Sequence, residues 1–289
     1  MNRIIEYGAA LGDLVMPRAC LACGCRLGMR ERHLCLSCAA DVPYTRFWLA
    51  PHNPLADRFN AVLERHRGTE PMDYAYAAAL IYYKGAYRSI PRALKYQGDL
   101  AAGRHYGALL GRRLAAAPHF ADIDLVIPVP LHWTRRRSRG YNQAEILARA
   151  LVDGFRASPR LLPEVRTDLL VRVRRTRTQT RVSVDQKARN VASAFQVPAR
   201  FSLWTRFLSR LSRLFSRSAR WPIEAGHDEN DPESPAVVLA SAHHILLVDD
   251  TFTTGATLYA CYAALRPFTA ARISIATLAA VEGAPSTGP

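Results

Sequence analysis

The residues best suited to chemistry lie in one run, 245–257. Four apolar residues at its start are typical of a buried parallel strand, and two carboxylates, Asp249 and Asp250, follow directly. A loop of hydroxyl residues around Gly255 comes next, and then a helical pattern begins. The free amides and the positive dipole end of a helix N-terminus favour a dianionic phosphate. The run therefore predicts a site for a sugar phosphate.

The donors and acceptors of this run suit different parts of such a ligand. Gly255 lets the backbone approach an anion closely, and the threonines around it can add hydroxyl donors. Asp249 and Asp250 only accept hydrogen bonds, so they suit vicinal sugar hydroxyls or a hydrated magnesium ion rather than the phosphate. An ordinary strand followed by an acidic turn is the alternative. The loop residues predicted to bind the substrate are Thr251, Thr253, Thr254, Gly255, Ala256 and Thr257.

A dense group of arginines follows a second apolar segment. Within residues 124–130 a buried strand is predicted over 125–129. Prolines stiffen the turn at its exit, so the basic loop after it, 131–143, is held at the edge of the sheet. Such a loop suits a diphosphate, which needs several cationic or N–H donors at once. Solvated surface is the alternative. The candidate diphosphate ligands are Arg135, Arg137 and Arg139.

A second basic stretch follows a strand predicted over 169–173. Residues 174–181 combine many like charges with few apolar anchors, which predicts a loop that becomes ordered when an anion binds. This loop can close over a reactive phosphorylated substrate, or it can contact nucleic acid. The candidate binding residues are Arg172 and Arg174.

Five of the six cysteines fall within nineteen residues and form two Cys-x-x-Cys pairs. Two thiolates on each of two tight turns satisfy the four tetrahedral positions of a structural zinc ion, and a site with four protein ligands has no open position for catalysis. Two disulfides are the alternative, and Cys25 or His33 could replace a ligand. The predicted ligands are Cys20, Cys23, Cys35 and Cys38.

Segments with strand and helix patterns alternate along the chain, which predicts an α/β fold with a mostly parallel sheet covered on both faces. Ligands of such sheets bind at the carboxyl ends of the strands. Further strands are predicted over 75–83 and 273–278, and helices over 87–96, 100–117, 143–155 and 258–266. The predicted organisation is an N-terminal helix and zinc ribbon at 1–45, a connector at 46–74, and a domain at 75–289 that is interrupted by an insertion at 198–242.

The 289-residue chain carries a formal net charge of +15, which favours phosphate-rich partners: nucleotides, nucleic acid or an anionic membrane. No run is long and apolar enough to span a bilayer, and the N-terminus is a poor secretion signal, so a cytoplasmic location is expected. Residues 201–217 predict a basic amphipathic helix. That helix could contact a membrane surface, bind DNA or dock on its own protein.

With these motifs in this order behind a zinc ribbon, the chain resembles the ComF family of competence-associated, phosphoribosyltransferase-like proteins. The resemblance covers almost everything except about 198–242 and the extreme C-terminus. It departs from the family pattern at Ala256, where a hydroxyl residue is usual, and at Lys187, where arginine is frequent. The matching motifs are the cysteine ribbon, Tyr83–Gly85, Leu94–Asp99, Pro128–Pro130, Arg139–Gln143, Arg172 with Thr176 and Gln179, Asn190 with Ala194–Phe195, and Val248–Thr257.

The resemblance implies a type I phosphoribosyltransferase fold that binds magnesium–phosphoribosyl pyrophosphate and could transfer the phosphoribosyl group to an acceptor that the sequence does not reveal. Lys95 joins the substrate-binding residues, and Asp249 and Asp250 act in catalysis by holding the ribose hydroxyls near the developing positive charge. The alternative it implies is a non-catalytic competence protein that binds single-stranded DNA and acts with a helicase-like partner in natural transformation.

Overall fold

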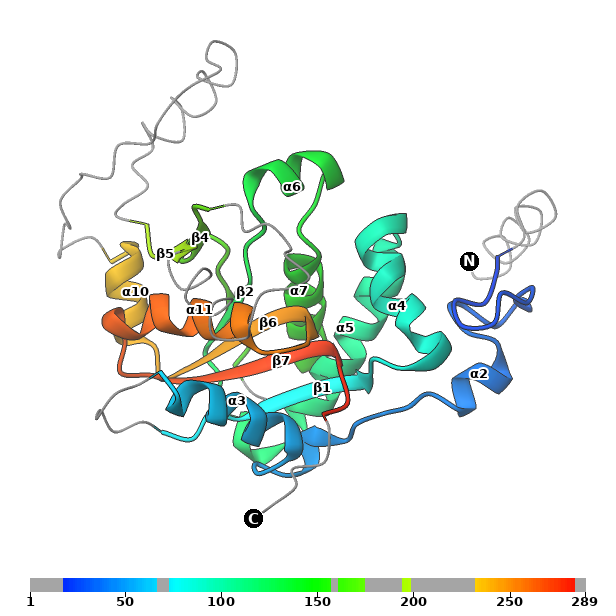
Figure 1. The fold of residues 1–289 in the computed structure, drawn as a ribbon, viewed down its shortest axis with the longest axis horizontal. Helices are drawn as coiled ribbons and strands as arrows, with labels where there is room; N and C mark the ends of the chain where they lie inside the picture. The colour runs from blue at the N-terminus through cyan, green and yellow to red at the C-terminus, as the bar shows by residue number, and fades with distance from the viewer. Residues whose placement is uncertain (1–17, 67–72, 157–160, 175–193, 199–231, 284–289) are drawn as a thin grey trace, which may run out of the picture.

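The fold is built on a five-stranded sheet whose strand order is β1-β7-β6-β2-β3, with every neighbouring pair parallel (Figure 1). The computed structural model describes residues 18–66, 73–156, 161–174, 194–198 and 232–283. The strands are β1 (Ala77–Tyr82), β2 (Leu125–Pro128), β3 (Glu164–Val165), β6 (His244–Phe252) and β7 (Arg272–Ala280). The prediction of an α/β protein with a mostly parallel sheet is confirmed.

Helices cover both faces of this sheet, as the continuous apolar runs of its central strands require (Figure 1). Leu246 and Val248 of β6 pack in one core cluster with α5 and α7, while Ile245 and Leu247 pack in the other with α3 and α11. This alternation gives β6 two buried faces. The covering helices are α3 (Pro54–Glu64), α5 (Leu100–Ala115), α7 (Gln143–Phe155), α10 (Pro235–Ser241) and α11 (Ala256–Leu265).

The pair α5 and α7 packs so closely that it leaves no room for side chains at several glycines. A Cβ placed on Gly111 would lie 1.9 Å from the carbonyl oxygen of Leu151, and one on Gly154 would lie 2.4 Å from that of Ala108. Backbone contact of this kind requires glycine on both helices. It fixes α7, and with it the residues at the α7 N-terminus, against the sheet.

The free edge of β1 is covered by the chain that arrives from the cysteine region. Tyr82 N donates to Pro43 O at 2.9 Å, and Thr45 N donates to Leu80 O at 3.2 Å, so this segment runs antiparallel to β1. Covering an edge removes a template for aggregation. The elements on either side of this contact are α2 (Leu36–Ala40), η1 (Phe47–Leu49), η2 (Gly85–Arg88), α4 (Ser89–Arg92) and the π-helical turn η3 (Ala93–Gln97).

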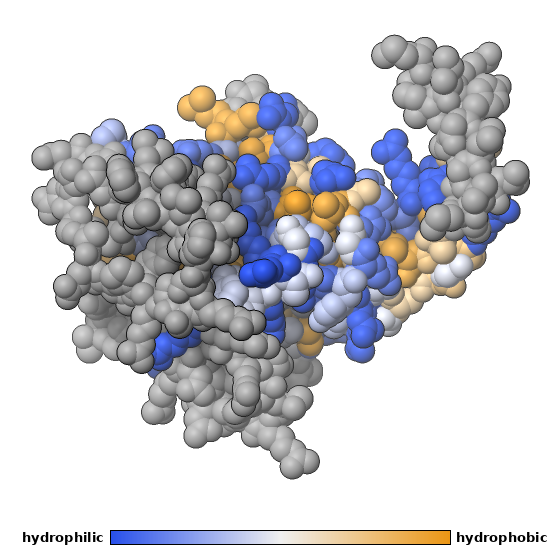
Figure 2. Space-filling model, turned by 90° about the horizontal axis from the view of Figure 1, so that it is seen from above, coloured by the Kyte–Doolittle hydropathy of each residue, from blue (hydrophilic) through white to orange (hydrophobic). Residues whose placement is uncertain are grey.

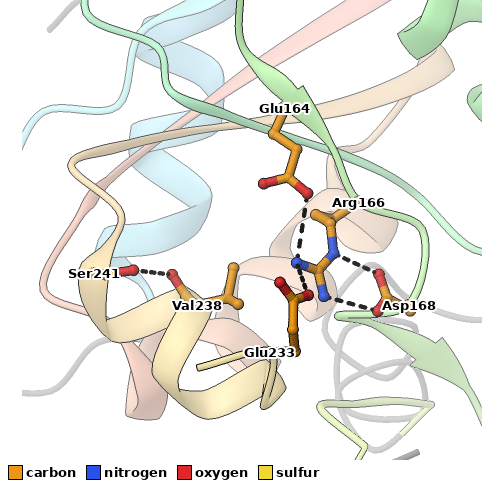
Figure 3. Close-up of polar contacts among 6 residues, drawn as sticks. All are labelled: Glu164, Arg166, Asp168, Glu233, Val238 and Ser241. Carbon is orange, nitrogen blue, oxygen red and sulfur yellow. Dashed lines mark hydrogen bonds and ion pairs between the residues drawn. The ribbon is translucent and has the colours of Figure 1, made fainter. Parts of the chain in front are cut away.

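The opposite edge strand, β3, is anchored through Arg166, whose side chain is 12% exposed. Its Nε and Nη2 donate to the two carboxylate oxygens of Asp168, each at 3.0 Å. Its Nη1 lies 3.5 Å from Glu164 and 3.3 Å from Glu233 (Figure 3). Because Glu233 stands just before α10, this ion-pair network ties β3 to that helix. Short 3₁₀ turns, η4 (Pro118–Phe120) and η5 (Arg266–Phe268), complete the connections.

Three sequence predictions are corrected here. β6 continues through Asp249, Asp250 and Thr251 to Phe252, because the equally long β7 pairs with it as far as Ala280. The basic loop predicted over 131–143 contains a helix, α6 (Trp133–Arg139), which ends where Gly140 takes φ of +80°. The strand predicted over 169–173 is reduced to β4 (Val171–Arg172), which pairs antiparallel with β5 (Phe195–Gln196) outside the main sheet.

The predicted helix at 143–155 is confirmed with the same bounds, and those at 87–96 and 100–117 are confirmed as helical segments. Several other predictions lie outside the described residues: the amphipathic helix at 201–217, the basic residues from 175 to 181, and Lys187. Among the helices that are described, none has the length and apolar character needed to cross a bilayer.

Candidate functional site

The two carboxylates at the carboxyl end of β6 point to opposite faces of the sheet, because consecutive strand residues alternate. Asp250 faces α7 and η3 and is only 3% exposed. Its Oδ1 accepts a hydrogen bond from Gln143 Nε2 at 3.3 Å, and its Oδ2 accepts one from the Thr251 hydroxyl at 2.5 Å and forms an ion pair with Lys95 Nζ. The protein itself therefore satisfies most of the acceptor capacity of Asp250.

Asp249 is half-buried on the other face and accepts a hydrogen bond from Asp250 N at 2.8 Å. Within the described part of the chain it keeps more acceptor capacity for a ligand than Asp250 does. Burial, and after it the neighbouring charge of Asp250, raises the pKa of Asp249 to about 7. A carboxyl group in this state gains from a ligand that supplies positive charge or hydroxyl donors.

Lys95 connects this edge of the sheet to the π-helical turn η3. Burial opposes the charge on its ammonium group, but the carboxylates of Asp250 and Asp249 outweigh burial and raise the pKa of Lys95. A π-helical turn often occurs at functional sites because it shifts the side-chain register of a helix. Here it carries Lys95 to Asp250, which is 155 positions later in the sequence.

The loop predicted to bind phosphate follows β6 and leads into the N-terminus of α11. Gly255 takes φ of +79° and serves as the N-cap of α11, while Thr253 and Thr254 are exposed. Ala256 N is 3.5 Å from the Thr254 hydroxyl, a long contact. As far as the structure describes the chain, the amides of Gly255, Thr257 and Leu258 make no hydrogen bond. These three amides keep their donor capacity for a ligand, although only Thr257 is half-buried and Gly255 and Leu258 are buried.

The arginines of α6 differ in what they contact. Arg139 is half-buried: its Nη1 donates to Gln143 Oε1 at 3.1 Å, and its guanidinium lies 5.3 Å from the centre of the Tyr96 ring. It therefore belongs to the same network as Asp250. Arg135 and Arg137 are exposed.

Arg172 of β4 is half-buried, and its guanidinium lies 5.2 Å from the centre of the Phe195 ring. Burial and the nearby charge of Arg135 lower its pKa, and Asp249 acts in the opposite direction. The structure thus brings Arg172 within electrostatic reach of both Arg135 and Asp249. Arg174 is exposed at the end of its described segment.

Sequence reasoning did not assign a role to Gln143, although it lies in the basic motif. Asn142 caps α7 by accepting from Ala144 N at 3.2 Å and donates to Val129 O at 3.1 Å. These contacts place Gln143 at the first helical position, beside the end of β6. The cap residue before an amphipathic pattern is a signal that could have located it.

The two Cys-x-x-Cys pairs converge as predicted: the sulfur atoms of Cys20, Cys23, Cys35 and Cys38 all lie within 4.8 Å of one another. The Cys23 and Cys35 sulfurs are 3.8 Å apart. That separation is far from the roughly 2.05 Å of a disulfide. It agrees with the edge of a tetrahedron whose zinc–sulfur bonds are about 2.3 Å. All six cysteines are free thiols, and the cluster is compatible with a structural zinc ion.

The two predicted substitute ligands lie outside this group of four. Cys25 is exposed. The His33 ring lies 5.1 Å from that of His105 and 5.9 Å from that of Tyr106, so it packs against α5. Tyr87 donates to Cys38 O at 2.9 Å. These contacts join the cysteine region to η2 and α5, the helical segments before and after the turn η3 that carries Lys95.

In comparisons with models of known protein families and with curated proteins, the chain matches neither a family model nor a curated protein.

Proposed function

We propose that this protein binds the magnesium complex of phosphoribosyl pyrophosphate and transfers its phosphoribosyl group to an acceptor, on a type I phosphoribosyltransferase-like fold of the ComF kind. One observation carries the proposal. Directly after two carboxylates at the carboxyl edge of a parallel sheet stands an open bend, and its Gly255, Thr257 and Leu258 amides make no hydrogen bond to any described residue. A helix N-terminus of this form favours phosphate, because its free N–H groups and the positive end of the helix dipole attract an anion.

Different residues of the chain bind the 5-phosphate, the ribose and the pyrophosphate of the donor molecule. The 5-phosphate lies on the loop amides and on the hydroxyls of Thr253, Thr254 and Thr257. Asp249 accepts from the ribose hydroxyls. The pyrophosphate lies toward the cationic side chains. Lys95 pairs with Asp250, and Arg139 is joined to Asp250 through Gln143. Arg172 lies within electrostatic reach of Arg135 and Asp249. Arg137 and Arg174 are exposed.

In the transfer, the bond from the anomeric carbon to the pyrophosphate oxygen breaks and its electron pair leaves with the pyrophosphate. The acceptor forms the new bond to that carbon and loses a proton. Asp249 stabilises the positive charge that develops on the ribose, and the arginines stabilise the departing anion.

The oxygen atoms of Asp249 fit a hard divalent cation, which prefers oxygen ligands. Magnesium, when bound, supplies charge neutralisation of the pyrophosphate. The four cysteines fit zinc, which would hold the ribbon together and take no part in the transfer.

Calorimetric titration of the metal-replete protein with magnesium–phosphoribosyl pyrophosphate tests the proposal. The wild-type protein should bind the ligand at one site. Asp249→Asn should weaken binding at least about tenfold, because a charged acceptor for the ribose hydroxyls is lost. Asp153→Asn, an exposed acidic residue on α7, is the matched control and should bind like the wild type. Absence of binding heat at high protein concentration would end the proposal.

A second function, binding of single-stranded DNA, is favoured by a different observation. Arg88, Arg92, Arg135 and Arg137 form no ion pair with any carboxylate in the described ranges, and two aromatic side chains beside them are exposed, Tyr96 by 71% and Trp133 by 65%. A pocket of about 620 Å³ is lined by Arg88, Arg92 and Tyr96 among others. Cationic grooves with exposed aromatic platforms suit the phosphates and bases of a single strand.

Seen from above the view of Figure 1, hydrophilic residues make up much of the coloured surface, with apolar areas between them (Figure 2). Under this second proposal the protein acts with a helicase-like partner in natural transformation, as its ComF-like motifs imply. A membrane contact would belong to 201–217, outside the described residues.

Fluorescence anisotropy with a labelled oligonucleotide at several salt concentrations tests DNA binding. Affinity should fall steeply as salt rises, with a slope that reports the number of phosphates contacted. The double variant Arg88→Gln/Arg92→Gln should reduce that slope, whereas Arg149→Gln, whose guanidinium is paired with Glu145, should leave it unchanged. If the oligonucleotide fails to bind even at low salt, the DNA role is lost.

A further inference from the structure

A residue of α3, within the connector predicted at 46–74, contacts the loop after β6. Arg58 of α3 donates from Nη2 to Thr253 O at 2.9 Å and from Nη1 to Val281 O at 2.7 Å. Thr253 begins the loop, and Val281 follows the end of β7. One guanidinium therefore joins α3 to the chain just beyond the ends of both central strands.

The ring of Phe252 completes this support. It lies below the Arg58 guanidinium, which is 5.2 Å from the ring centre. The same ring also lies against Gly255, where an added Cβ would meet Phe252 Cζ at 3.0 Å. Phe252 is almost fully buried, so it gives the loop a rigid base. The loop backbone is thus held at Thr253 by hydrogen bonding and at Gly255 by packing.

These contacts have two consequences for an anion in the loop. Because the Thr253 carbonyl accepts from Arg58, its partial negative charge faces the guanidinium and is partly neutralised. Arg58 makes no ion pair with a carboxylate of the described chain, so its positive charge is not cancelled locally. Burial lowers its pKa, but a guanidinium stays protonated in proteins. Both effects favour an anion on the exposed side of the loop.

We propose that Arg58 is a positioning residue for the phosphate loop: it fixes the Thr253 carbonyl so that the amides of Gly255, Thr257 and Leu258 face the 5-phosphate. The inference rests on the proposed function, because it assumes that this loop takes the 5-phosphate of the donor. It goes beyond that function by assigning a role to α3, which carries none of the residues predicted to bind the substrate.

A purely structural Arg58 would act differently from a positioning residue. If Arg58 only attached α3 to the sheet, its loss would loosen the whole ligand site. If it positions the loop, its loss affects the 5-phosphate subsite and leaves the pyrophosphate subsite, formed by Lys95 and the arginines, unchanged. Two probe ligands separate these outcomes: ribose 5-phosphate and inorganic pyrophosphate with magnesium.

Calorimetry should compare the wild-type protein with Arg58→Met, Arg58→Lys and the control Arg65→Met, an exposed residue at the end of the same helix. Arg58→Met should weaken ribose 5-phosphate about tenfold and change pyrophosphate affinity less than about twofold. Arg58→Lys should recover part of the loss, because an ammonium group can donate to Thr253 O but cannot bridge both carbonyls. Arg65→Met should bind both probes like the wild type.

Thermal unfolding of each variant accompanies the titrations, so that Arg58→Lys carries the comparison if Arg58→Met is unstable. Unchanged ribose 5-phosphate affinity in both Arg58 variants, or equal losses for the two probes, would overturn the role of Arg58. If the wild-type protein binds neither probe, the result contradicts the proposed function itself, and the role of Arg58 falls with it. Unchanged affinity for both probes in the wild type and in every variant would leave the function standing and remove Arg58 from it.

Discussion

The cysteine ribbon and the edge of the sheet at β6 are two candidate ligand sites built in opposite ways. The four ribbon thiols come from one turn and the start of α2, all within nineteen residues, and their sulfur atoms lie within 4.8 Å of one another. The sheet-edge site draws Lys95, Gln143 and the carboxylates of β6 from three separate elements, and Arg58 contacts a loop residue 195 positions away. The ribbon geometry follows from local spacing, whereas the other site exists only once the sheet has formed.

This difference predicts how each site fails. Four thiolates that hold one zinc ion would share that single partner, so loss of any of them should release the metal completely. The residues at the sheet edge support one another in pairs, so each substitution should remove one contact and leave the others in place. The substitutions that follow test this contrast.

The largest expected effect is loss of the ribbon metal. Cys35→Ser should lose bound zinc and the local fold of 18–42, because structural zinc contributes on the order of 10 kcal/mol to folding in small zinc sites. Cys25→Ser is the matched control, since Cys25 lies outside the group of four. Atomic absorption measures the bound zinc of each variant, and hydrogen exchange measures the local fold of 18–42. Equal loss of zinc in both variants would show that the ligand set is wrong.

Lys95→Met should have the next largest effect, because it leaves the Asp250 carboxylate buried without its partner. Breaking a buried ion pair costs about 3–5 kcal/mol. Lys84→Met is the matched control: Lys84 pairs with Glu282 at 3.6 Å with both side chains well exposed, and such a pair contributes about 0–1 kcal/mol. Urea unfolding measures both free energies. Similar losses in the two variants would mean that the Lys95 pair is not buried in solution.

The raised pKa of Asp249 predicts a pH dependence of stability. Between its ordinary value of 3.8 and its native value of about 7, the folded protein holds a proton that the unfolded chain has lost. The contribution of Asp249 to stability therefore declines as pH rises through this window, by at most about 1.4 kcal/mol per pH unit, and is flat outside it. Asp249→Asn should lack this decline, whereas the surface variant Asp153→Asn should retain it. Unfolding free energies measured from pH 4 to 8 would contradict the account if the wild-type and Asp249→Asn curves ran parallel.

Gly255→Ala should have the smallest effect on stability, about 1 kcal/mol, because φ of +79° is unfavourable for a residue with a Cβ. Gly85→Ala is the control, since Gly85 also has positive φ but no atom within 4 Å of an added Cβ. Both variants should lose stability in thermal unfolding. Only Gly255→Ala should also weaken ribose 5-phosphate, because its Cβ pushes against the Phe252 ring. Unaltered affinity of Gly255→Ala for ribose 5-phosphate would mean that the phosphate does not bind at this loop.

Much of the fold could be predicted because the decisive patterns are local. The apolar run 245–248 and the amphipathic pattern at 143–155 mark β6 and α7, and the cysteine spacing marks the ribbon. The limits of β6 could not be predicted, because its extension to Phe252 depends on pairing with β7. The helix α6 was taken for a loop because its arginines give no apolar periodicity.

At the site, local sequence identified the carboxylates and the phosphate loop but not how they are held. That Asp249 and Asp250 face opposite sides follows from the extension of β6 through both residues, which the apolar run does not show. Gln143 and Arg58 act through contacts with residues more than a hundred positions away. The capping signal places Gln143 at the start of a helix but does not show its contact with Asp250, and no spacing pattern reveals that of Arg58. Long-range contacts of this kind became visible only in the folded chain.

A metal-replete crystal soaked with magnesium–phosphoribosyl pyrophosphate tests the central claim most directly. The account predicts density for the 5-phosphate within about 3 Å of the amides of Gly255, Thr257 and Leu258, with the ribose hydroxyls at Asp249. The pyrophosphate should lie toward Lys95 and the arginines of α6. Density for the ligand away from the loop after β6, or an empty loop at saturating ligand, would contradict it.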